Sequence, residues 1–245
     1  MSFNLKPCSF QGEPLIEHLL RSMNIVEKNF SERYYRIIAR RISIATGEKY
    51  NCEEIACSLN TSILLHDIGK AAEVYQRNFN DKCECKYKRF FELHEIPSSI
   101  ITFNSLKDRV DYDLAELASL SVLLHMSSFR PFNKILYRLK SFSRENSDGW
   151  IFSKYTKERL SNILEKYSLD ASILIDISPR EAEKFLYEKK KYIDSFKTPS
   201  KLYILFLAPI VIGDNLSAFK FRANKIENKS RNTFMSELCR VIDFE

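Results

Sequence analysis

The spacing of apolar side chains along this chain is predominantly helical. Apolar residues recur mostly every three or four positions, as on one face of an α-helix, rather than alternating as in a half-buried strand. Glycine is scarce, with 5 residues among 245, whereas the many tight turns of an all-β sandwich favour glycine. We therefore predict an all-α fold. Its helices are expected at residues 14–23, 31–46, 52–68, 70–79, 112–127, 155–167, 179–195, 200–221 and 230–242.

Local signals mark some of these boundaries. Ser178 precedes Pro179, and Glu181 stands three residues after the serine. This order predicts a capping box with proline in the first helical turn, which together satisfy the exposed amide groups. Two polar stretches, 80–88 and 141–149, are predicted to be loops.

No internal repeat, low-complexity segment or shift in composition divides the chain. We expect a single domain over residues 1–245, with a basic segment from about 219 to 245. The formal net charge is +6, which favours a polyanionic partner but equally fits an ordinary soluble surface.

The chain shows no sign of secretion or membrane insertion. Residues 1–13 lack the apolar core of a secretory signal, and the longest apolar run, 202–213, is too short to span a bilayer. We expect a cytoplasmic protein with no membrane partner. The six cysteines form no C-x-x-C pair, so we expect reduced thiols. A disulfide is expected only in an intracellular protein of a hyperthermophile.

The most informative local sequence is Leu65-His66-Asp67-Ile68-Gly69-Lys70, which closes an apolar run. A carboxylate buried at such a helix end is costly to desolvate without a partner. A divalent cation supplies that partner, because it binds both the carboxylate and the imidazole. Gly69 would let another helix or a substrate approach the backbone, and Lys70 would face a phosphate. Taken alone, the segment also fits a capped helix end with a solvated His-Asp pair.

The other histidines change this interpretation. The chain has four, His18, His66, His94 and His125, and each lies in or beside an apolar helical segment. Each one singly fits a hydrogen-bonded core histidine. Jointly, inward-facing histidines on separate helices indicate a set of metal ligands. Asp214 follows another apolar turn and is a further carboxylate that would need a partner if buried.

The order H…H-D…H…H…D on predicted helices resembles the HD metal-dependent phosphohydrolase superfamily. Several flanking residues are similar in particular to the CRISPR-associated HD nuclease, the nuclease half of the type I interference helicase-nuclease. They are Leu19 after His18, H-D-I-G-K-A followed by Tyr75 and Gln76, Ser98 after His94-Glu95, and G-D-N-L-S around Asp214. The similarity spans roughly residues 14–220, and the length suits the stand-alone form whose helicase is a separate polypeptide.

This resemblance implies an HD-domain helical bundle that holds one or two divalent metal ions. One ion would be held by His18, His66, Asp67 and Asp214, and Asp67 would bridge to a second ion held by His94 and His125. Asp67 and Lys70 would be the catalytic residues. The mixed nitrogen and oxygen ligands suit manganese, nickel, cobalt or iron, and suit magnesium less naturally.

The chain departs from the family pattern at residue 126. Many relatives have two adjacent histidines where this chain has His125-Met126, and methionine is a poor ligand for hard cations. Water would fill the gap, or the second metal would bind weakly or only with substrate. Glu95 either orients His94 or is an ordinary surface carboxylate.

A track for nucleic acid is predicted after the Asp214 helix. Lys220, Arg222 and Lys225 lie there with phenylalanines between them, which suits charge neutralisation and base stacking on single-stranded DNA. The same residues also fit a solvated helix end with core phenylalanines. The run 189–191 of three lysines is expected to be a solvated helical face.

The function implied by the resemblance is metal-dependent hydrolysis of DNA in antiviral defence. The expected substrate is single-stranded DNA exposed by a CRISPR RNA-guided effector complex. No G-x-x-x-x-G-K-[ST] motif is present, so unwinding would require a separate CRISPR helicase subunit. Two alternatives remain open. One is an HD nucleotidase acting on small nucleotides, and the other is a catalytically weak, metal-binding docking subunit.

Overall fold

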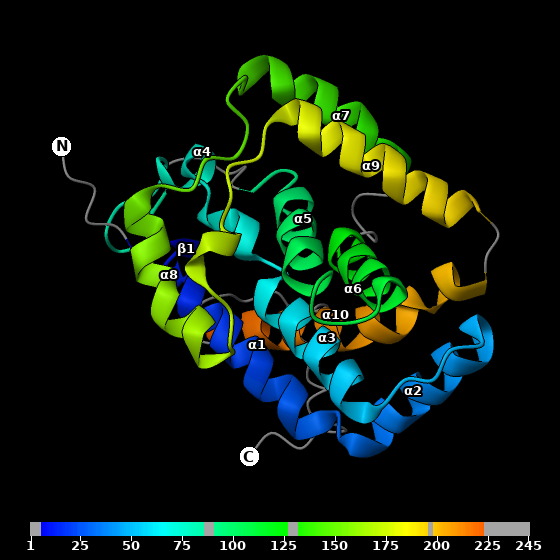
Figure 1. Cartoon of the computed structure of the whole chain (residues 1–245). Helices are drawn as coiled ribbons and strands as arrows, with labels where there is room; N and C mark the ends of the chain where they lie inside the picture. The colour runs from blue at the N-terminus through cyan, green and yellow to red at the C-terminus, as the bar shows by residue number, and fades with distance from the viewer. Residues whose placement is uncertain (1–5, 86–90, 127–131, 196–197, 223–245) are drawn as a thin grey trace.

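The structure is a computed structural model that describes residues 6–85, 91–126, 132–195 and 198–222. Within these ranges it is almost entirely helical, so the all-α prediction is confirmed (Figure 1). The α-helices are α1 (Leu15–Asn29), α2 (Glu32–Thr46), α3 (Cys52–Leu65), α4 (Glu73–Gln76), α5 (Glu95–Leu106), α6 (Tyr112–Leu124), α7 (Phe132–Glu145), α8 (Lys154–Lys166), α9 (Pro179–Asp194) and α10 (Ile204–Arg222). Short 3-10 helices are η1 (Ile68–Ala71), η2 (Ala171–Ile173) and η3 (Thr198–Tyr203), and a small antiparallel hairpin pairs β1 (Cys8–Phe10) with β2 (Glu13–Pro14).

The centre of the fold is built from α3, α5, α6 and α10. Every residue of α6 from Leu114 to Leu124 is buried, because this helix is apolar or small around most of its circumference. α5 packs along α6, and α1 packs along α10 and against α3. In Figure 1, α7 and α9 run side by side above this centre and α8 covers one flank. The end of α3, the start of α5 and the end of α6 therefore meet between α1 and α10.

Two helices were not predicted from the sequence. α5 is buried on nearly all faces, so it lacks the amphipathic period that marks a surface helix. α7 has a single buried stripe of Ile135, Leu139 and Phe142. Phe142 continues this stripe past the predicted start of the 141–149 loop, so that loop prediction was wrong for residues 141–145.

The predicted helix at 70–79 is interrupted. η1 ends at Ala71, and Ala72 is extended with φ −63° and ψ 143°, before the single turn of α4. The carbonyl of Lys70 accepts a hydrogen bond from the Gln76 side chain (2.6 Å) instead of from a backbone amide. The predicted helix at 230–242 lies outside the described residues.

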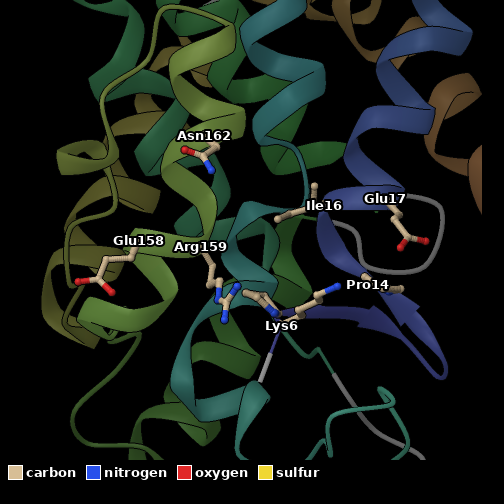
Figure 2. Close-up of a pocket in the computed structure, with 8 residues that line it drawn as sticks. Lys6, Pro14, Ile16, Glu17, Glu158, Arg159 and Asn162 are labelled. Atoms are coloured by element: carbon tan, nitrogen blue, oxygen red, sulfur yellow. The ribbon is translucent and has the colours of Figure 1, made fainter. Parts of the chain in front are cut away.

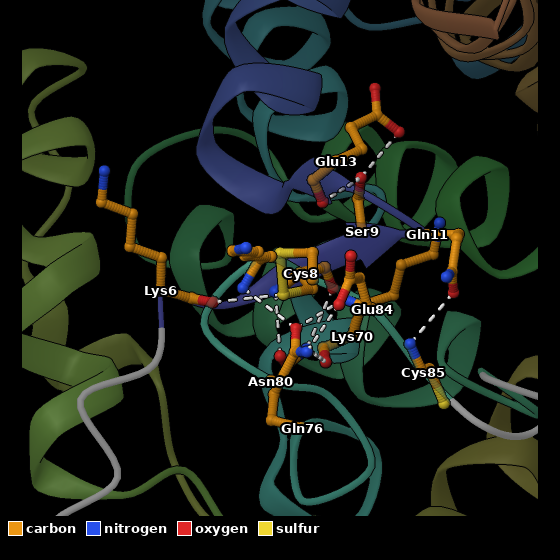
Figure 3. Close-up of a disulfide and its surroundings, with 12 residues drawn as sticks. Lys6, Cys8, Ser9, Gln11, Glu13, Lys70, Gln76, Asn80, Glu84 and Cys85 are labelled. Atoms are coloured by element: carbon orange, nitrogen blue, oxygen red, sulfur yellow. Dashed lines mark hydrogen bonds between the residues drawn. A yellow bond between two sulfur atoms is a disulfide. The ribbon is translucent and has the colours of Figure 1, made fainter. Parts of the chain in front are cut away.

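A disulfide corrects the expectation of reduced thiols throughout. Cys8 and Cys83, which are 75 residues apart, are bonded with an S–S distance of 2.00 Å (Figure 3). The bond fastens the β1–β2 hairpin to the segment that follows α4. Phe79 packs against both cysteines, so the sulfur atoms are buried in a small apolar cluster of their own. Of the other described cysteines, Cys52 and Cys57 are free thiols.

The segment from Ser200 to Phe221 is long and apolar enough to cross a membrane by length and composition alone. A core helix of a soluble protein has the same character. Here its middle packs closely on α1, because a Cβ at Gly213 would lie 3.1 Å from the carbonyl oxygen of Ser22. The helix is therefore part of the packed helical centre.

Candidate metal centre

The six residues predicted to bind metal come together at one place. They form two groups in which the possible ligand atoms lie within 4.8 Å of one another, and the groups share Asp67. The first group is His18, His66, Asp67 and Asp214, and the second is Asp67, His94 and His125. They come from α1, the end of α3, the turn before α5, the end of α6 and the middle of α10. Residues from distant parts of the chain thus converge on one aspartate.

Three of the histidines are oriented by the same local device. Nδ1 of His66, His94 and His125 lies 2.6, 2.7 and 2.6 Å from the backbone carbonyl oxygen three residues earlier. A carbonyl oxygen only accepts, so Nδ1 carries the proton in each ring. His66 and His125 follow the last turns of α3 and α6, where backbone carbonyls lack helical partners. In the neutral form that binds a metal, each ring would therefore present an Nε2 lone pair to the centre.

Asp67 divides its two oxygens between the groups. Oδ2 lies 3.2 Å from Nε2 of His18 and 3.5 Å from Nε2 of His66. Oδ1 lies 2.8 Å from Nε2 of His94 and 3.6 Å from Nε2 of His125. Burial raises the pKa of Asp67, but the positive charge of Lys70 and the surrounding histidines outweigh it and hold that pKa well below its usual range. Asp67 is thus an ionised carboxylate facing four imidazoles.

The electrostatics of these contacts fit a cation. Nε2 of all four histidines and Oδ1 of Asp67 are buried without a hydrogen-bond partner among the described residues. Burial lowers the pKa of His94 despite the neighbouring Asp67, so this ring is neutral near pH 7. A neutral ring has one proton for two acceptors, the Phe91 carbonyl at 2.7 Å and Asp67 Oδ1 at 2.8 Å. A divalent cation held by His94 and Asp67 would relieve the remaining contact between lone pairs.

Asp214 completes the first group on its solvent side. Its Oδ1 lies 3.2 Å from Nε2 of His18 and 3.9 Å from Nε2 of His66. The Asp214 side chain is 21% exposed, whereas the side chains of Asp67 and the four histidines are at most 3% exposed. Burial raises the pKa of Asp214, but the facing imidazoles of His18 and His66 hold it well below its usual range. The centre is therefore open to solvent beside Asp214.

Lys70 lies against the shared aspartate. Its Nζ is 2.5 Å from Asp67 Oδ2 and stands 5.2 Å from the centre of the Phe91 ring. The η1 turn places residues three apart on one side, which brings Lys70 back over Asp67. The prediction that Lys70 faces a phosphate stays a prediction, because its ammonium group faces a carboxylate in this structure.

Two glycines allow the close packing that assembles the centre. A Cβ at Gly69 would lie 2.3 Å from the carbonyl oxygen of His94, so only glycine lets the start of α5 approach η1. The Gly69 amide also donates to Ser98 Oγ at 2.9 Å. The sequence predicted a close approach by a helix or a substrate at Gly69, and the structure shows that a helix occupies the space. Gly213 plays the same part between α10 and α1.

Sequence reasoning missed one carboxylate beside the centre. Glu13 is 1% exposed, and its Oε1 lies 3.3 Å from Nδ1 of His18. The one signal in the sequence was its proximity, because Glu13 stands five residues before the predicted ligand His18. For Glu95 the open choice is settled: it is fully buried with Oε2 3.5 Å from His94 Nδ1, so it is not a surface carboxylate.

The second group is smaller than the first among the described residues. It offers three ligand residues, and Met126, which follows His125, is half-buried. It stays a prediction that water fills the remaining coordination position, or that the second metal binds weakly or only with substrate.

The predicted DNA track lies mostly beyond what the structure describes. Lys220 is exposed in the last turns of α10, and Arg222 is the last residue of that helix. Lys225 lies outside the described residues. The basic segment at 219–245 and its role thus stay predictions. The prediction of a solvated 189–191 face was wrong for Lys189, which is 1% exposed and has its Nζ 2.5 Å from Glu116 Oε2.

A cavity of about 260 Å³ lies apart from the metal centre, between the start of α1 and α8 (Figure 2). Its charged lining residues are Lys6, Glu17, Glu158 and Arg159, so the two signs nearly balance. None of the six predicted ligands lines this cavity.

A helical domain that gathers four histidines and two aspartates around one shared carboxylate, in this order along the chain, is an HD domain. Comparison with known proteins identifies its branch. The chain is 31% identical over 226 residues to the CRISPR-associated endonuclease Cas3-HD of Saccharolobus solfataricus, covering 90% of this chain and 91% of that protein. It is 28% identical over 227 residues to the Cas3-HD endonuclease of Methanocaldococcus jannaschii, covering 84% and 86%.

A solved structure agrees with these relatives. The CRISPR-associated Cas3 HD domain protein from Methanocaldococcus jannaschii superposes with a TM-score of 0.57 at 27% identity, covering 82% of this chain and 97% of that one. No family model matches the chain. The chain belongs to the family of CRISPR-associated Cas3-HD endonucleases. The predicted resemblance is thereby confirmed.

Proposed function

We propose that this protein is a metal-dependent deoxyribonuclease that cuts single-stranded DNA during CRISPR interference. The observation that carries the proposal is Asp67, whose two oxygens face two separate sets of imidazole nitrogen atoms. The relatives that support a nuclease are named endonucleases. We further propose a separate CRISPR helicase subunit and an RNA-guided effector complex as its partners, and the cytoplasm as its location.

The proposed chemistry follows from the ligand atoms. When bound, a divalent ion supplies an activated water near neutral pH and a positive charge for the non-bridging phosphate oxygens. The first group would hold it through His18, His66, Asp67 and Asp214, and the second through Asp67, His94 and His125. Nitrogen and oxygen ligands together favour manganese, nickel, cobalt or iron over magnesium.

The chain's own residues would do three things in the reaction. Asp67 holds both groups together, so the attacking and leaving oxygens are placed relative to one fixed carboxylate. Lys70, which is 14% exposed at the edge of Asp67, adds positive charge where a phosphate oxygen would approach. Asp214 stands at the solvent side, where a DNA strand would enter. Lys220, Arg222 and Lys225 would bind the strand beyond it.

The test is cleavage of end-labelled single-stranded DNA by the purified protein, with manganese, nickel, cobalt or magnesium added singly. Wild-type protein should cut with at least one of these ions and stop on addition of chelator. Asp67→Asn should lower the rate by at least about a hundredfold, because it keeps the side-chain volume but removes the shared charge. The exposed Asp108 serves as the matched control, and Asp108→Asn should cut like wild type.

Duplex DNA, RNA and a panel of nucleotides are tested under the same conditions. Hydrolysis of a nucleotide with all DNA left intact would contradict the proposed substrate and favour a nucleotidase. Metal binding without hydrolysis of any of these substrates, even with the helicase subunit added, would favour a docking role.

A further inference from the structure

His18 is held differently from the other three histidines of the centre. Each of those rings donates Nδ1–H to a backbone carbonyl at 2.6–2.7 Å, so the local chain sets its tautomer. His18 lies inside α1, where backbone carbonyls are already engaged in helical hydrogen bonds. Its Nδ1 must therefore find a partner among side chains.

Two side chains face Nδ1 of His18, and each can accept a hydrogen bond from an Nδ1–H group. Glu13 Oε1 lies at 3.3 Å and Ser217 Oγ at 3.2 Å. Ser217 Oγ donates its own hydrogen to the His18 carbonyl oxygen at 3.2 Å, so toward the ring it acts as an acceptor. Nδ1 therefore carries the proton, and Nε2 turns toward Asp67 and Asp214.

Glu13 is itself fixed on every side. Arg21 donates from Nη1 to Oε1 at 2.8 Å, and Ser9 donates from Oγ to Oε2 at 2.8 Å. Arg21 also reaches the carbonyl oxygen of Ser217 on α10 at 3.4 Å. A carboxylate that is 1% exposed is stable as an anion only with such partners. The contacts join the hairpin, α1 and α10 around one imidazole.

The hairpin that carries Glu13 is anchored independently of this network (Figure 3). Cys8 is bonded to Cys83, and the Gly12 amide donates to the Cys83 carbonyl at 2.7 Å. The Cys8 amide donates to Gln76 Oε1 at 2.8 Å. Glu13 follows Gly12 directly, so its backbone is held on a rigid support beside α1.

We propose that Glu13 is a positioning residue for the metal group of His18, His66, Asp67 and Asp214. It fixes the ring angle and tautomer of His18 and, as an anion, increases the donor strength of Nε2 toward a metal. This inference rests on the proposed metal binding but not on the proposed DNA substrate.

The experiment measures manganese binding to the metal-free full chain without DNA, by following free manganese in its paramagnetic resonance spectrum. Glu13→Gln should weaken the tightest binding about 10–100-fold, as expected when the carboxylate behind a ligand histidine is lost. Glu17→Gln is the matched control. Glu17 lies four residues after Glu13 in the sequence, its side chain is exposed, and the substitution makes the same chemical change. Its manganese affinity should equal that of wild type.

A second readout separates positioning from general loosening of the fold. In the cobalt-loaded protein, each ligating ring that keeps its Nδ1–H gives a paramagnetically shifted exchangeable proton signal. Glu13→Gln should move or remove the His18 signal and leave that of His66 in place, because His66 donates to the Ile63 carbonyl. If Glu13→Gln fails to fold, Glu13→Asp retains the charge but withdraws the carboxylate, and should weaken binding by a smaller factor.

Wild-type affinity in whichever of these Glu13 variants folds would overturn the proposal while leaving the nuclease assignment intact. Absence of manganese or cobalt binding to wild-type protein would overturn it as well. Wild-type protein that binds metal but does not cut DNA would instead count against the proposed substrate.

Discussion

His18 shows how a single residue of the centre depends on its surroundings. Burial disfavours the charged imidazolium, but the facing carboxylates of Asp214, Asp67 and Glu13 outweigh burial and raise the pKa of His18 to about 10. Without metal the ring is therefore protonated near neutral pH, and the proton on Nε2 lies between two carboxylates at 3.2 Å. The proton occupies the position that a metal would take.

Metal binding should consequently release a proton from His18. A ligand histidine must be neutral, and this one stays charged until the pH approaches its pKa of about 10. Between pH 6.5 and 8.5 the apparent affinity for manganese should rise about tenfold per pH unit, with about one proton released per ion. Calorimetry in buffers of different ionisation enthalpy measures the proton count. His18→Gln should lower the number of protons released, and a pH-independent wild-type affinity would contradict this account.

At the scale of elements, the centre depends on how closely α10 lies on α1. A Cβ at Gly213 would be 2.9 Å from Val26 Cγ2 and 3.1 Å from the Ser22 carbonyl oxygen. The next residue of α10, Asp214, is the one that reaches His18. A small change in the distance between the two helices therefore acts directly on the first metal group.

Gly213→Ala should push α10 away from α1. We expect a loss of about 1–3 kcal/mol in the free energy of unfolding, as for other overpacked sites, together with weaker manganese binding. Gly47→Ala is the matched control: Gly47 has φ +81° at the end of α2, and nothing lies within 4 Å of its added Cβ. It should lower stability by about 1 kcal/mol through backbone strain but leave manganese affinity unchanged. Urea unfolding and manganese titration compare the two, and equal affinities would exclude the proposed effect of helix spacing.

The helices also show where sequence patterns succeed. The capping box of Ser178 and Glu181 is present at the start of α9 as predicted, because its hydrogen bonds span only three residues. α5 escaped prediction because full burial erases the amphipathic period. An amphipathic period arises because one face of a helix meets solvent. A helix that is buried on all faces therefore lacks this period.

At the scale of the whole molecule, the Cys8–Cys83 disulfide joins the N-terminal hairpin to the segment after α4. It closes a loop over a sequence separation of 75 residues, and in the chain-entropy model such a link stabilises the fold by about 4.5 kcal/mol. The link also supports the hairpin that carries Glu13. Its loss should therefore affect both stability and the metal centre.

Reducing agent should lower the urea midpoint of wild-type protein and weaken its manganese binding. Cys8→Ala should unfold at a lower midpoint from the outset and show no further response to reductant. Cys52→Ala retains the disulfide and should respond as wild type does, since Cys52 is a free thiol. An unchanged wild-type midpoint under full reduction, verified by thiol counting, would contradict a stabilising role.

Local pattern by itself determined the helical class, and with the family resemblance it predicted the candidate residues of the metal centre. His66, Asp67, His125 and Asp214 stand at the ends of apolar helical runs, where a polar side chain faces inward and needs a partner. Such runs are readable because burial imposes a period on neighbouring residues. Together with the order of the ligands, they were sufficient to predict the family.

Only the tertiary structure decided which groups meet. The Glu13–His18 contact, the buried Lys189–Glu116 pair and the Cys8–Cys83 bond all join segments by side-chain contacts that no local period encodes. Lys189 looks like part of a solvated run until α9 packs against α5 and α7 and brings its ammonium group to Glu116. Whether a charged residue is buried depends on what the rest of the chain places opposite it, and that is a property of the packed molecule.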